Sequence, residues 1–257
     1  MKESRFPKFV LFLVVVFLYL PILVLVVTSF SESRFGDISS SFSLKWYARL
    51  FQDREIWEAL KNTLIVGFVA TIISTILGTM SAYALYRFQT RWQSLHYGLV
   101  YAPLVIPDVL MGMSLLLLFM SLAFPLSLIT IIMAHTTFCI SYVAMVVLAR
   151  LENFDYFVIE AAEDLGANWL TVVFEIVIPI LAPGIISGAL LAFTISIDDY
   201  IVTSFVAGPG TSTLPIHVYG MIKFGATPVI NALSTLILAV TFFLGVMTQY
   251  FTKESMV

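Results

Sequence analysis

Two long apolar stretches in the middle of the chain contain very few groups that can carry a charge. Residues 97–149 hold Asp108 and His135, and residues 176–200 hold Asp198 and Asp199, with no lysine or arginine in either stretch. A carboxylate inside a bilayer costs at least about 2.5 kcal/mol, so it is expected to face a water-filled path or a partner. Unpaired carboxylates beside such a path attract a cation and repel an anion. These residues therefore predict the passage of a cation.

Each acid also has a structural interpretation. Asp108 directly follows Pro107, so its carboxylate suits the first turn of a helix that begins after a break at the prolines. Asp198 and Asp199 lie close to the expected outer end of their stretch, where a carboxylate reaches water without any path. Because adjacent helical residues point about 100° apart, only one of this pair is expected to face a path, and the order of polar residues favours Asp198.

His135 and Cys139 receive simpler interpretations. His135 is expected to be an interhelical hydrogen-bond partner in preference to a proton relay. Cys139 is the single cysteine, so no internal disulfide can form, and its apolar surroundings indicate a buried thiol. No metal site and no cofactor are expected on this chain.

The composition places the chain in a membrane. Hydrophobic residues make up 60% of its 257 residues and charged residues 11%, with a mean hydropathy of +1.00, whereas soluble domains are about half apolar and a quarter charged. In hydrocarbon, an uninterrupted apolar run satisfies its backbone hydrogen bonds by forming a helix. We therefore expect an all-α, polytopic membrane protein. The net charge of -3 offers no basic surface to a nucleic acid.

Six apolar stretches are long enough to span a bilayer, and residues 1–257 are predicted to form one membrane domain without a soluble domain. The first stretch is too long for the core of a signal peptide and lacks a small-residue cleavage site, so it is expected to be retained. Residues 31–62 show near-helical apolar spacing, which predicts surface helices with Trp46 and Trp57 as interfacial anchors. The predicted spans are Phe9–Phe30, Thr63–Leu85, Tyr97–Leu122, Phe124–Leu148, Ile176–Ile197 and Val229–Phe251.

Basic residues near the span ends set the expected orientation. With the N-terminus inside, the inner and outer segments hold similar numbers of lysines and arginines, but most of the outer ones lie in the long segment 31–62. Basic residues in short segments count most toward orientation. Both termini are therefore expected in the cytoplasm, together with the loop of about residues 150–175.

Residues 152–183 combine an acidic patch, a glycine and a return to apolar sequence. Asp155 is placed to cap a helix over residues 156–165, Gly166 suits the left-handed conformation that ends a helix, and Asn168 suits the cap of a second helix. Pro179 and Pro183 are expected to bend the chain as it re-enters the membrane. We expect this loop to present small side chains and carboxylates to a basic partner. These residues are Glu160, Ala161, Ala162, Glu163 and Asp164.

The loop resembles the EAA motif of ABC importer permeases. Glu160-Ala161-Ala162 is followed after three residues by Gly166 and, nine residues later, by the sequence IVIP that ends at Pro179. Leucine is common where Ile178 stands, which is a conservative departure. The resemblance implies a type I ABC importer permease fold, in which this loop is a coupling helix that docks into a groove of a cytoplasmic ATPase. An ordinary amphipathic loop helix with a glycine cap is the alternative.

The chain has no phosphate-binding loop of its own. The glycine-rich segment from Gly208 to Pro215 lacks the lysine and the preceding strand that such a loop requires. ATP and Mg²⁺ are therefore expected on a separate polypeptide, and this chain is expected to be a transport subunit and not an enzyme.

Residues 196–238 resemble the polyamine branch of these permeases, through the pieces SIDDYIVTSFVAGPG and TLPIHVYGMIKFG. With the loop, the likeness extends over most of the chain. It implies a bacterial inner membrane assembly of this chain, a homologous permease, two ATPase subunits and a periplasmic polyamine-binding protein, with spermidine or putrescine passing between the permeases. Separated carboxylates suit such a polycation, and aromatic rings add cation–π contacts, although packing is their commoner role. The candidate rings are Tyr19, Tyr101 and Tyr200.

Three alternatives stay open: an EAA-type permease for an oxyanion, thiamine or iron, an ATP-independent channel or secondary carrier, and an intramembrane enzyme. Acidic spans without basic residues argue against an anion. No H-E-x-x-H or G-x-S-x-G pattern supports an enzyme, and no evident internal repeat supports a secondary carrier.

Overall fold

The computed structural model describes residues 5–33, 41–88, 91–152, 154–155, 157–225 and 228–254. They belong to two compact units, Met1–Trp57 with Val218–Val257 and Glu58–His217. The described residues form helices and one isolated β-bridge, which joins Ser31 and Phe42. This confirms the all-α fold expected from the composition.

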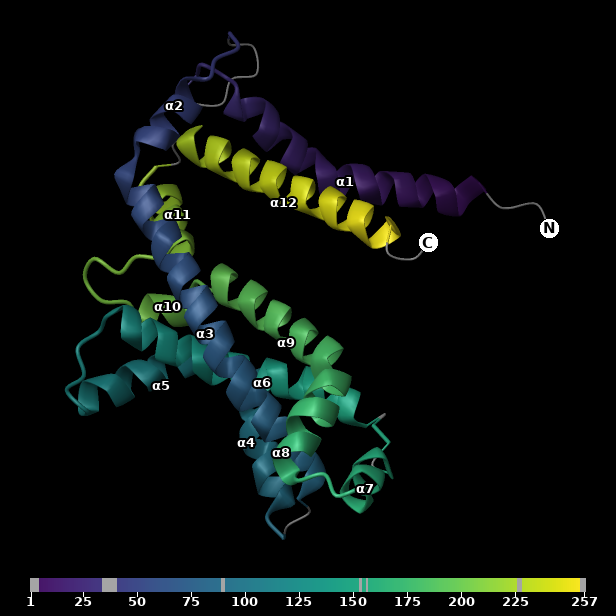
Figure 1. Cartoon of the computed structure of the whole chain (residues 1–257). Helices are drawn as coiled ribbons and strands as arrows, with labels where there is room; N and C mark the ends of the chain where they lie inside the picture. The colour runs from purple at the N-terminus through teal and green to yellow at the C-terminus, as the bar shows by residue number, and fades with distance from the viewer. Residues whose placement is uncertain are drawn as a thin grey trace. The chain divides into compact units, whose positions relative to one another are not determined.

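The first unit is built on two long helices, α1 Arg5–Ser29 and α12 Pro228–Glu254, and on the short helix α2 Lys45–Gln52 (Figure 1). α12 packs on both of the others. Asn231 of α12 donates an Nδ2–H to Thr28 Oγ1 at 3.1 Å. Polar side chains thus help to join the two long helices.

Trp46 is a core residue of this unit. It is 5% exposed, and its indole N–H donates to the Ser31 carbonyl at 2.8 Å. The expectation of an interfacial anchor at Trp46 is therefore wrong, because the ring turns inward and its one polar atom finds a backbone acceptor. Trp57 is 39% exposed and stacks on Phe51.

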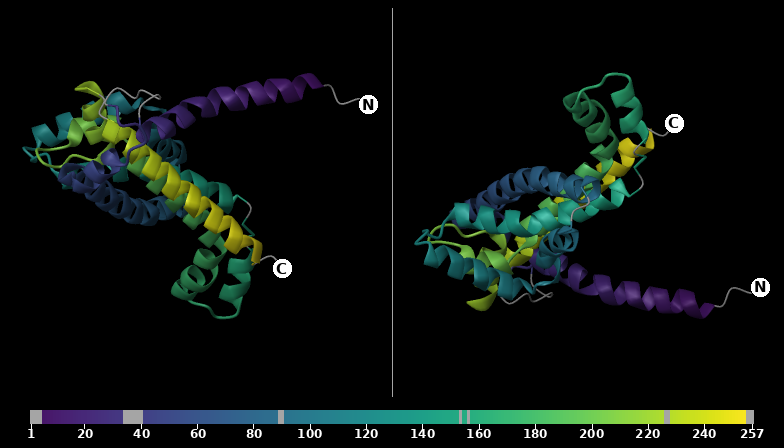
Figure 2. Two further views of the ribbon diagram at one scale, coloured as in Figure 1. Left: turned by 90° about the horizontal axis from the view of Figure 1, so that it is seen from above. Right: turned by 90° about the horizontal axis from the view of Figure 1, so that it is seen from below.

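The second unit is arranged around α6 Leu128–Leu151, and the buried side chains of α6 form much of the core of this unit. α6 packs on α9 Ile178–Asp198, α4 Gln93–Val105, α10 Ile201–Val206 and α5 Asp108–Ser121. Figure 2 shows the short helices between α6 and α9 projecting from one end of this unit. The other elements of this unit are α7 Phe157–Asp164, α8 Trp169–Thr171, the π-helix η1 Val172–Val177 and α3 Arg54–Arg87 from Glu58 onward. The helix α11 Leu214–Lys223 begins in the second unit and ends in the first.

Val143, near the middle of α6, lies between two glycines. A Cβ atom added at Gly78 of α3 would lie 2.8 Å from Val143 Cβ, and one added at Gly188 of α9 would lie 3.4 Å from Val143 Cα. Helices in membranes pack through such small residues because lipid supplies no hydrophobic force between them. α3 and α9 therefore both approach α6 closely at Val143.

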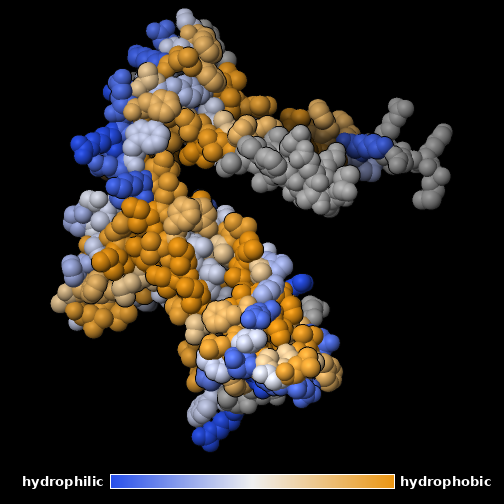
Figure 3. Space-filling view, in the orientation of Figure 1, coloured by the Kyte–Doolittle hydropathy of each residue, from blue (hydrophilic) through white to orange (hydrophobic). Residues whose placement is uncertain are grey.

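Among the described residues, four helical segments are each long and apolar enough to cross a membrane: Phe6–Ser29, α3, α6 and Trp169–Asp198. α4 and α5 are each too short to span a membrane alone and make a fifth segment only when they are counted together. The two helices meet at an angle of 108°. α12 coincides with the predicted sixth span, and its part Pro228–Phe243 is apolar. Figure 3 shows hydrophobic residues over the flank of the second unit. A polytopic membrane protein is confirmed, whereas six straight spans are not.

The break expected at the prolines of the predicted third span is present at Pro107 and absent at Pro103, which lies inside α4. α4 ends at Val105 and α5 begins at Asp108, with Ile106 and Pro107 in extended conformation between them. Pro107 lacks the N–H that would continue α4, and it restricts the residue before it to extended backbone. The chain therefore changes direction at this proline.

Replacing Gly78 by alanine tests the contact around Val143. The added methyl group would collide with Val143 Cβ, and overpacking a close contact costs about 1–3 kcal/mol. We expect a lower midpoint of thermal unfolding in detergent. Gly98→Ala is the matched control, because a Cβ at Gly98 of α4 meets nothing within 4 Å. Equal stability of the two variants would contradict the close packing of α3 on α6.

Candidate functional site

The loop between α6 and α9 contains a complete C-terminal helix cap at the end of α7. Gly166 has a φ of 88°, in the left-handed region that favours glycine. Its N–H donates to the Glu163 carbonyl at 2.9 Å, and the Ala167 N–H donates to the Ala162 carbonyl at 3.0 Å. This pair of bonds is the Schellman motif, which satisfies the last carbonyls of a helix. The predicted end of the helix at Gly166 is confirmed.

Two side chains cap the helices on either side of this glycine. Asp155 Oδ1 accepts from the Phe157 N–H at 3.0 Å at the start of α7, and Asn168 Oδ1 accepts from the Thr171 N–H at 3.0 Å at the start of α8. Both caps were expected from the sequence and are confirmed. Tyr156, the expected first residue of α7, lies outside the described residues.

α7 presents its acidic side to the surroundings. Glu160, Ala161, Glu163 and Asp164 are exposed and Ala162 is half-buried. Ile159, by contrast, is buried and belongs to the core of the second unit. The helix is therefore fixed to the unit along one side, and the other side is open to a partner.

The second loop helix is continuous with the membrane helix. α8, η1 and α9 form one helical segment of 30 residues, Trp169–Asp198, and Pro179 and Pro183 lie inside it. The bend expected at these prolines stays a prediction, and helical hydrogen bonding continues past Pro179. A π-helix directly precedes Pro179, with the Ile178 N–H bonded to the Val173 carbonyl five residues back. Its wider turn relieves the clash that a proline ring makes with the preceding turn of an α-helix.

Asp108 and Asp198 lie near one contact between α5 and α10. A Cβ at Gly112 of α5 would lie 2.6 Å from the Phe205 ring and 3.2 Å from Val202 Cα, so α5 and α10 touch there. Asp108 stands one helical turn before Gly112, about 6 Å along the axis. Asp198 stands four residues before Val202.

Both of these carboxylates face outward. Asp108 is the first residue of α5 and Asp198 the last residue of α9, and both are exposed. Within the described part of the chain, neither makes a side-chain hydrogen bond or an ion pair. Asp108 thus fits a helix start, as one interpretation held, and it also stays open to a ligand.

Asp199 has a different environment from its neighbour. Its carboxylate accepts from the Val202 N–H at 3.3 Å and from the Thr203 N–H at 2.8 Å, which caps α10. The Thr203 hydroxyl donates to Asp199 Oδ2 at 2.6 Å, and His135 Nε2 lies 3.5 Å from the same oxygen. His135 is 1% exposed and also contacts Ser196. The expected interhelical role of His135 is confirmed, and no spacing pattern indicated its partners, which are 61 and 68 residues away along the chain.

The candidate tyrosines lie in different surroundings. Tyr19 is exposed on α1, in the first unit. Tyr101 on α4 is half-buried, with its ring centroid 6.1 Å from that of Tyr97, and Tyr200 is half-buried at the start of α10. A ligand-binding role for the three rings stays a prediction.

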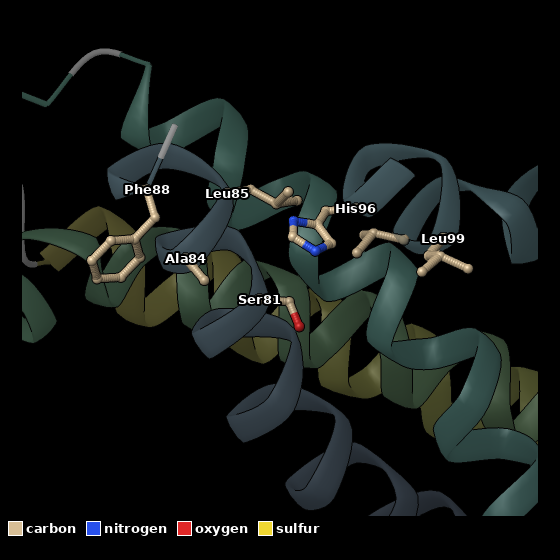
Figure 4. Close-up of a pocket in the computed structure, with 7 residues that line it drawn as sticks. Ser81, Ala84, Leu85, Phe88, His96 and Leu99 are labelled. Atoms are coloured by element: carbon tan, nitrogen blue, oxygen red, sulfur yellow. The ribbon is translucent and has the colours of Figure 1, made fainter. Parts of the chain in front are cut away.

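A groove of about 390 Å³ lies between the end of α3 and the start of α4. Figure 4 shows His96 of α4 near Leu85 of α3, with Ser81 one turn earlier on α3. The other lining residues are apolar, among them Phe88 and Leu99. This groove contains none of the predicted path residues, and its lining suits a hydrocarbon chain better than a cation.

Comparisons with known proteins agree with this arrangement. The chain matches the family model "Binding-protein-dependent transport system inner membrane component" over residues 74–253. It is 38% identical to the spermidine/putrescine transport system permease protein PotC of Haemophilus influenzae, over 95% of each chain. It is 43% identical to the putrescine transport system permease protein PotI of Escherichia coli K12, over 91% of this chain and 86% of that protein.

Solved structures show the same fold at low identity. A bacterial ABC transporter involved in alginate import superposes with a TM-score of 0.75 at 17% identity, covering 98% of this chain and 99% of that one. The MetNI methionine ABC transporter gives a TM-score of 0.59 at 18% identity, covering 76% and 91%. The predicted ABC importer permease fold is thereby confirmed.

Replacing Gly166 by alanine tests the cap of α7. A left-handed backbone costs an alanine about 1–2 kcal/mol, and a Cβ there meets nothing within 4 Å, so no clash contributes. We expect faster amide hydrogen exchange in α7 and unchanged exchange in α6. Gly166→Asn is the control with a smaller expected effect, because asparagine tolerates this conformation better. Unchanged exchange in the alanine variant would show that the cap does not hold α7.

Proposed function

Since the chain belongs to the family of inner membrane components of binding-protein-dependent transport systems, we propose that it is a permease subunit of an ATP-driven polyamine importer. Identity of 38% and 43% to permeases named for spermidine and putrescine transport supports this substrate most directly. The charge of the candidate path agrees, because polyamines are cations. The whole chain, as one permease domain, supplies half of the path and no catalytic group.

Asp108 and Asp198 are the carboxylates that we propose to contact the substrate amines. Both are exposed, and both stand beside the α5–α10 contact at Gly112. A flexible polycation with separated amines can pass between carboxylates without losing every contact at once. Asp199 is assigned a supporting place in the path, because its oxygens already accept hydrogen bonds. Cation–π contacts are proposed for Tyr19, Tyr101 and Tyr200.

The loop that contains α7 and α8 is the proposed site of attachment to the motor. Its free carboxylates suit basic groups, and Ala161 allows close approach of a partner. Pro179 and the preceding π-helix lie at the base of this loop, where α8 continues into the membrane helix. A displacement of the loop would therefore move α9. The coupling residues proposed are Glu160, Ala161, Ala162, Glu163, Asp164, Gly166 and Pro179.

The proposed assembly contains four kinds of subunit in a bacterial inner membrane. A homologous permease supplies the other half of the path, two cytoplasmic ATPase subunits bind ATP and Mg²⁺, and a periplasmic binding protein delivers the polyamine. The chain itself holds no cofactor in this proposal. Both termini and the α7–α8 loop lie in the cytoplasm, following the bias of basic residues in the short segments.

Uptake in proteoliposomes tests the substrate and the path together. The chain is co-expressed with candidate partner subunits, and ATP-dependent uptake of labelled spermidine and putrescine is compared with uptake of sulfate. Polyamine uptake that needs ATP is expected, with none of sulfate. Replacing Asp108 or Asp198 by asparagine removes a charge from the path, and uptake should fall about tenfold, corresponding to about 1.4 kcal/mol, with the ATPase still attached.

Glu152→Gln is the matched control for these two variants, because it neutralises an exposed acid at the end of α6, away from the α5–α10 contact. Its uptake should equal that of the unaltered chain. Full uptake by both aspartate variants would refute the electrostatic account of the path. Uptake without any ATPase subunit would instead support a channel or secondary carrier.

Reversing the charge of Glu160 tests the coupling loop. Glu160 is exposed on α7, so lysine there should leave folding and insertion unchanged while repelling a basic partner group. We expect loss of ATPase co-purification and of uptake, measured against Glu152→Lys, which makes the same change eight residues earlier. If Glu160→Lys retains both, the loop is not the docking site.

A further inference from the structure

The second unit contains a chain of four hydrogen-bonded side chains that the proposed path leaves unused. His135 Nδ1 lies 2.7 Å from Ser196 Oγ, and His135 Nε2 lies 2.8 Å from Thr203 Oγ1. The Thr203 hydroxyl in turn lies 2.6 Å from Asp199 Oδ2. His135 comes from α6, Ser196 from α9 and Thr203 from α10, and Asp199 is the first of the two residues between α9 and α10. One buried imidazole thus joins the central helix to both sides of a helix break.

The donors and acceptors in this chain can be ordered from one end. An ionised Asp199 only accepts, so the Thr203 hydroxyl donates its single hydrogen to it. Thr203 Oγ1 then accepts from His135 Nε2–H. A neutral imidazole with its hydrogen on Nε2 leaves Nδ1 as an acceptor for the Ser196 hydroxyl. Every polar hydrogen of the four side chains is used, which buried groups in an apolar interior require.

This network fixes the conformation at the end of α9. Asp199 has an extended backbone, with φ -67° and ψ 121°, which separates α9 from α10. Its carboxylate is drawn inward by Thr203 and by the first N–H groups of α10. Asp198, one residue earlier, remains exposed. The two adjacent acids therefore have different positions, and the difference depends on what holds Asp199.

We propose that His135 is a positioning residue for transport: through Thr203 it holds Asp199 inward and thereby presents Asp198 to the substrate path. The inference rests on the proposed function of Asp198. α6 is suited to the task because the residues one turn on either side of His135, Ile131 and Cys139, are fully buried. The imidazole thus projects from a helix that cannot shift without repacking the core. Without it, Thr203 and Asp199 lose their tie to α6, and Asp198 loses its fixed direction.

The test measures polyamine taken up per ATP hydrolysed by the complete importer in proteoliposomes. A variant that only lowers the amount of folded importer reduces uptake and ATP hydrolysis together and leaves this ratio unchanged. His135→Phe removes both hydrogen bonds, and Thr203→Val removes the hydroxyl that joins His135 to Asp199, with little change in shape. Loss of one such link should lower the ratio about threefold or more in each variant.

A double-mutant comparison connects the effect to Asp198. Asp198→Asn alone should lower the ratio about tenfold, as proposed for the path. Adding His135→Phe to Asp198→Asn should lower it no further, because residues that act through one another are not additive. His135→Gln should recover part of the ratio, since its amide can still donate toward Thr203.

Thr136→Val is the control on α6, because the hydroxyl of Thr136 is buried and has no hydrogen-bond partner in the described part of the chain. Its ratio should be unchanged. An unaltered ratio in Thr203→Val, or independent effects of His135→Phe and Asp198→Asn, would overturn the positioning role alone. An unaltered ratio in Asp198→Asn would overturn the proposed path and this inference with it. If His135→Phe does not insert, Thr203→Val decides.

Discussion

Hydrocarbon solvates no polar group, and the local structure of this chain follows from that constraint. A helix end that lies in hydrocarbon is stabilised when its free N–H groups find acceptors within the chain. The start of α10 does so through Asp199. Where a carboxylate stays unbonded, as at Asp108 and Asp198, its solvation is left to water or to a ligand. The unbonded groups are therefore the informative ones.

The adjacent acids at the end of α9 show how one sequence feature divides into two roles. The Asp199 carboxylate caps α10 and accepts a hydrogen bond from the Thr203 hydroxyl, whereas the Asp198 side chain remains exposed. A single acid could not serve both needs, because a carboxylate that caps a helix has its oxygens occupied. The pair is best understood as a structural acid that supports a functional one.

Local signals in the sequence predicted local structure well. The caps at Asp155 and Asn168 and the left-handed glycine at Gly166 each depend on a few neighbouring residues, and all three are present. The same holds for the helix start at Asp108. The sequence could also favour Asp198 over Asp199, because helical geometry separates adjacent side chains.

Features that depend on distant residues could not be predicted. The partners of His135 are 61 and 68 residues away along the chain, so no spacing pattern reveals them. The inward turn of Trp46 depends on a carbonyl fifteen residues earlier. The angle of 108° between α4 and α5 is set by packing on α6 and α10, although Pro107 marked the place. The π-helix before Pro179 likewise has no signal in the spacing of residues.

α9, at the end of the continuous helical segment from Trp169 to Asp198, has a mechanical consequence. Its 21 residues are about 32 Å long at a rise of 1.5 Å per residue, so a tilt of about 7° moves one end by about 4 Å relative to the other. A small swing at the loop end of α9 is thereby converted into a stroke comparable to the reach of a salt bridge at Asp198.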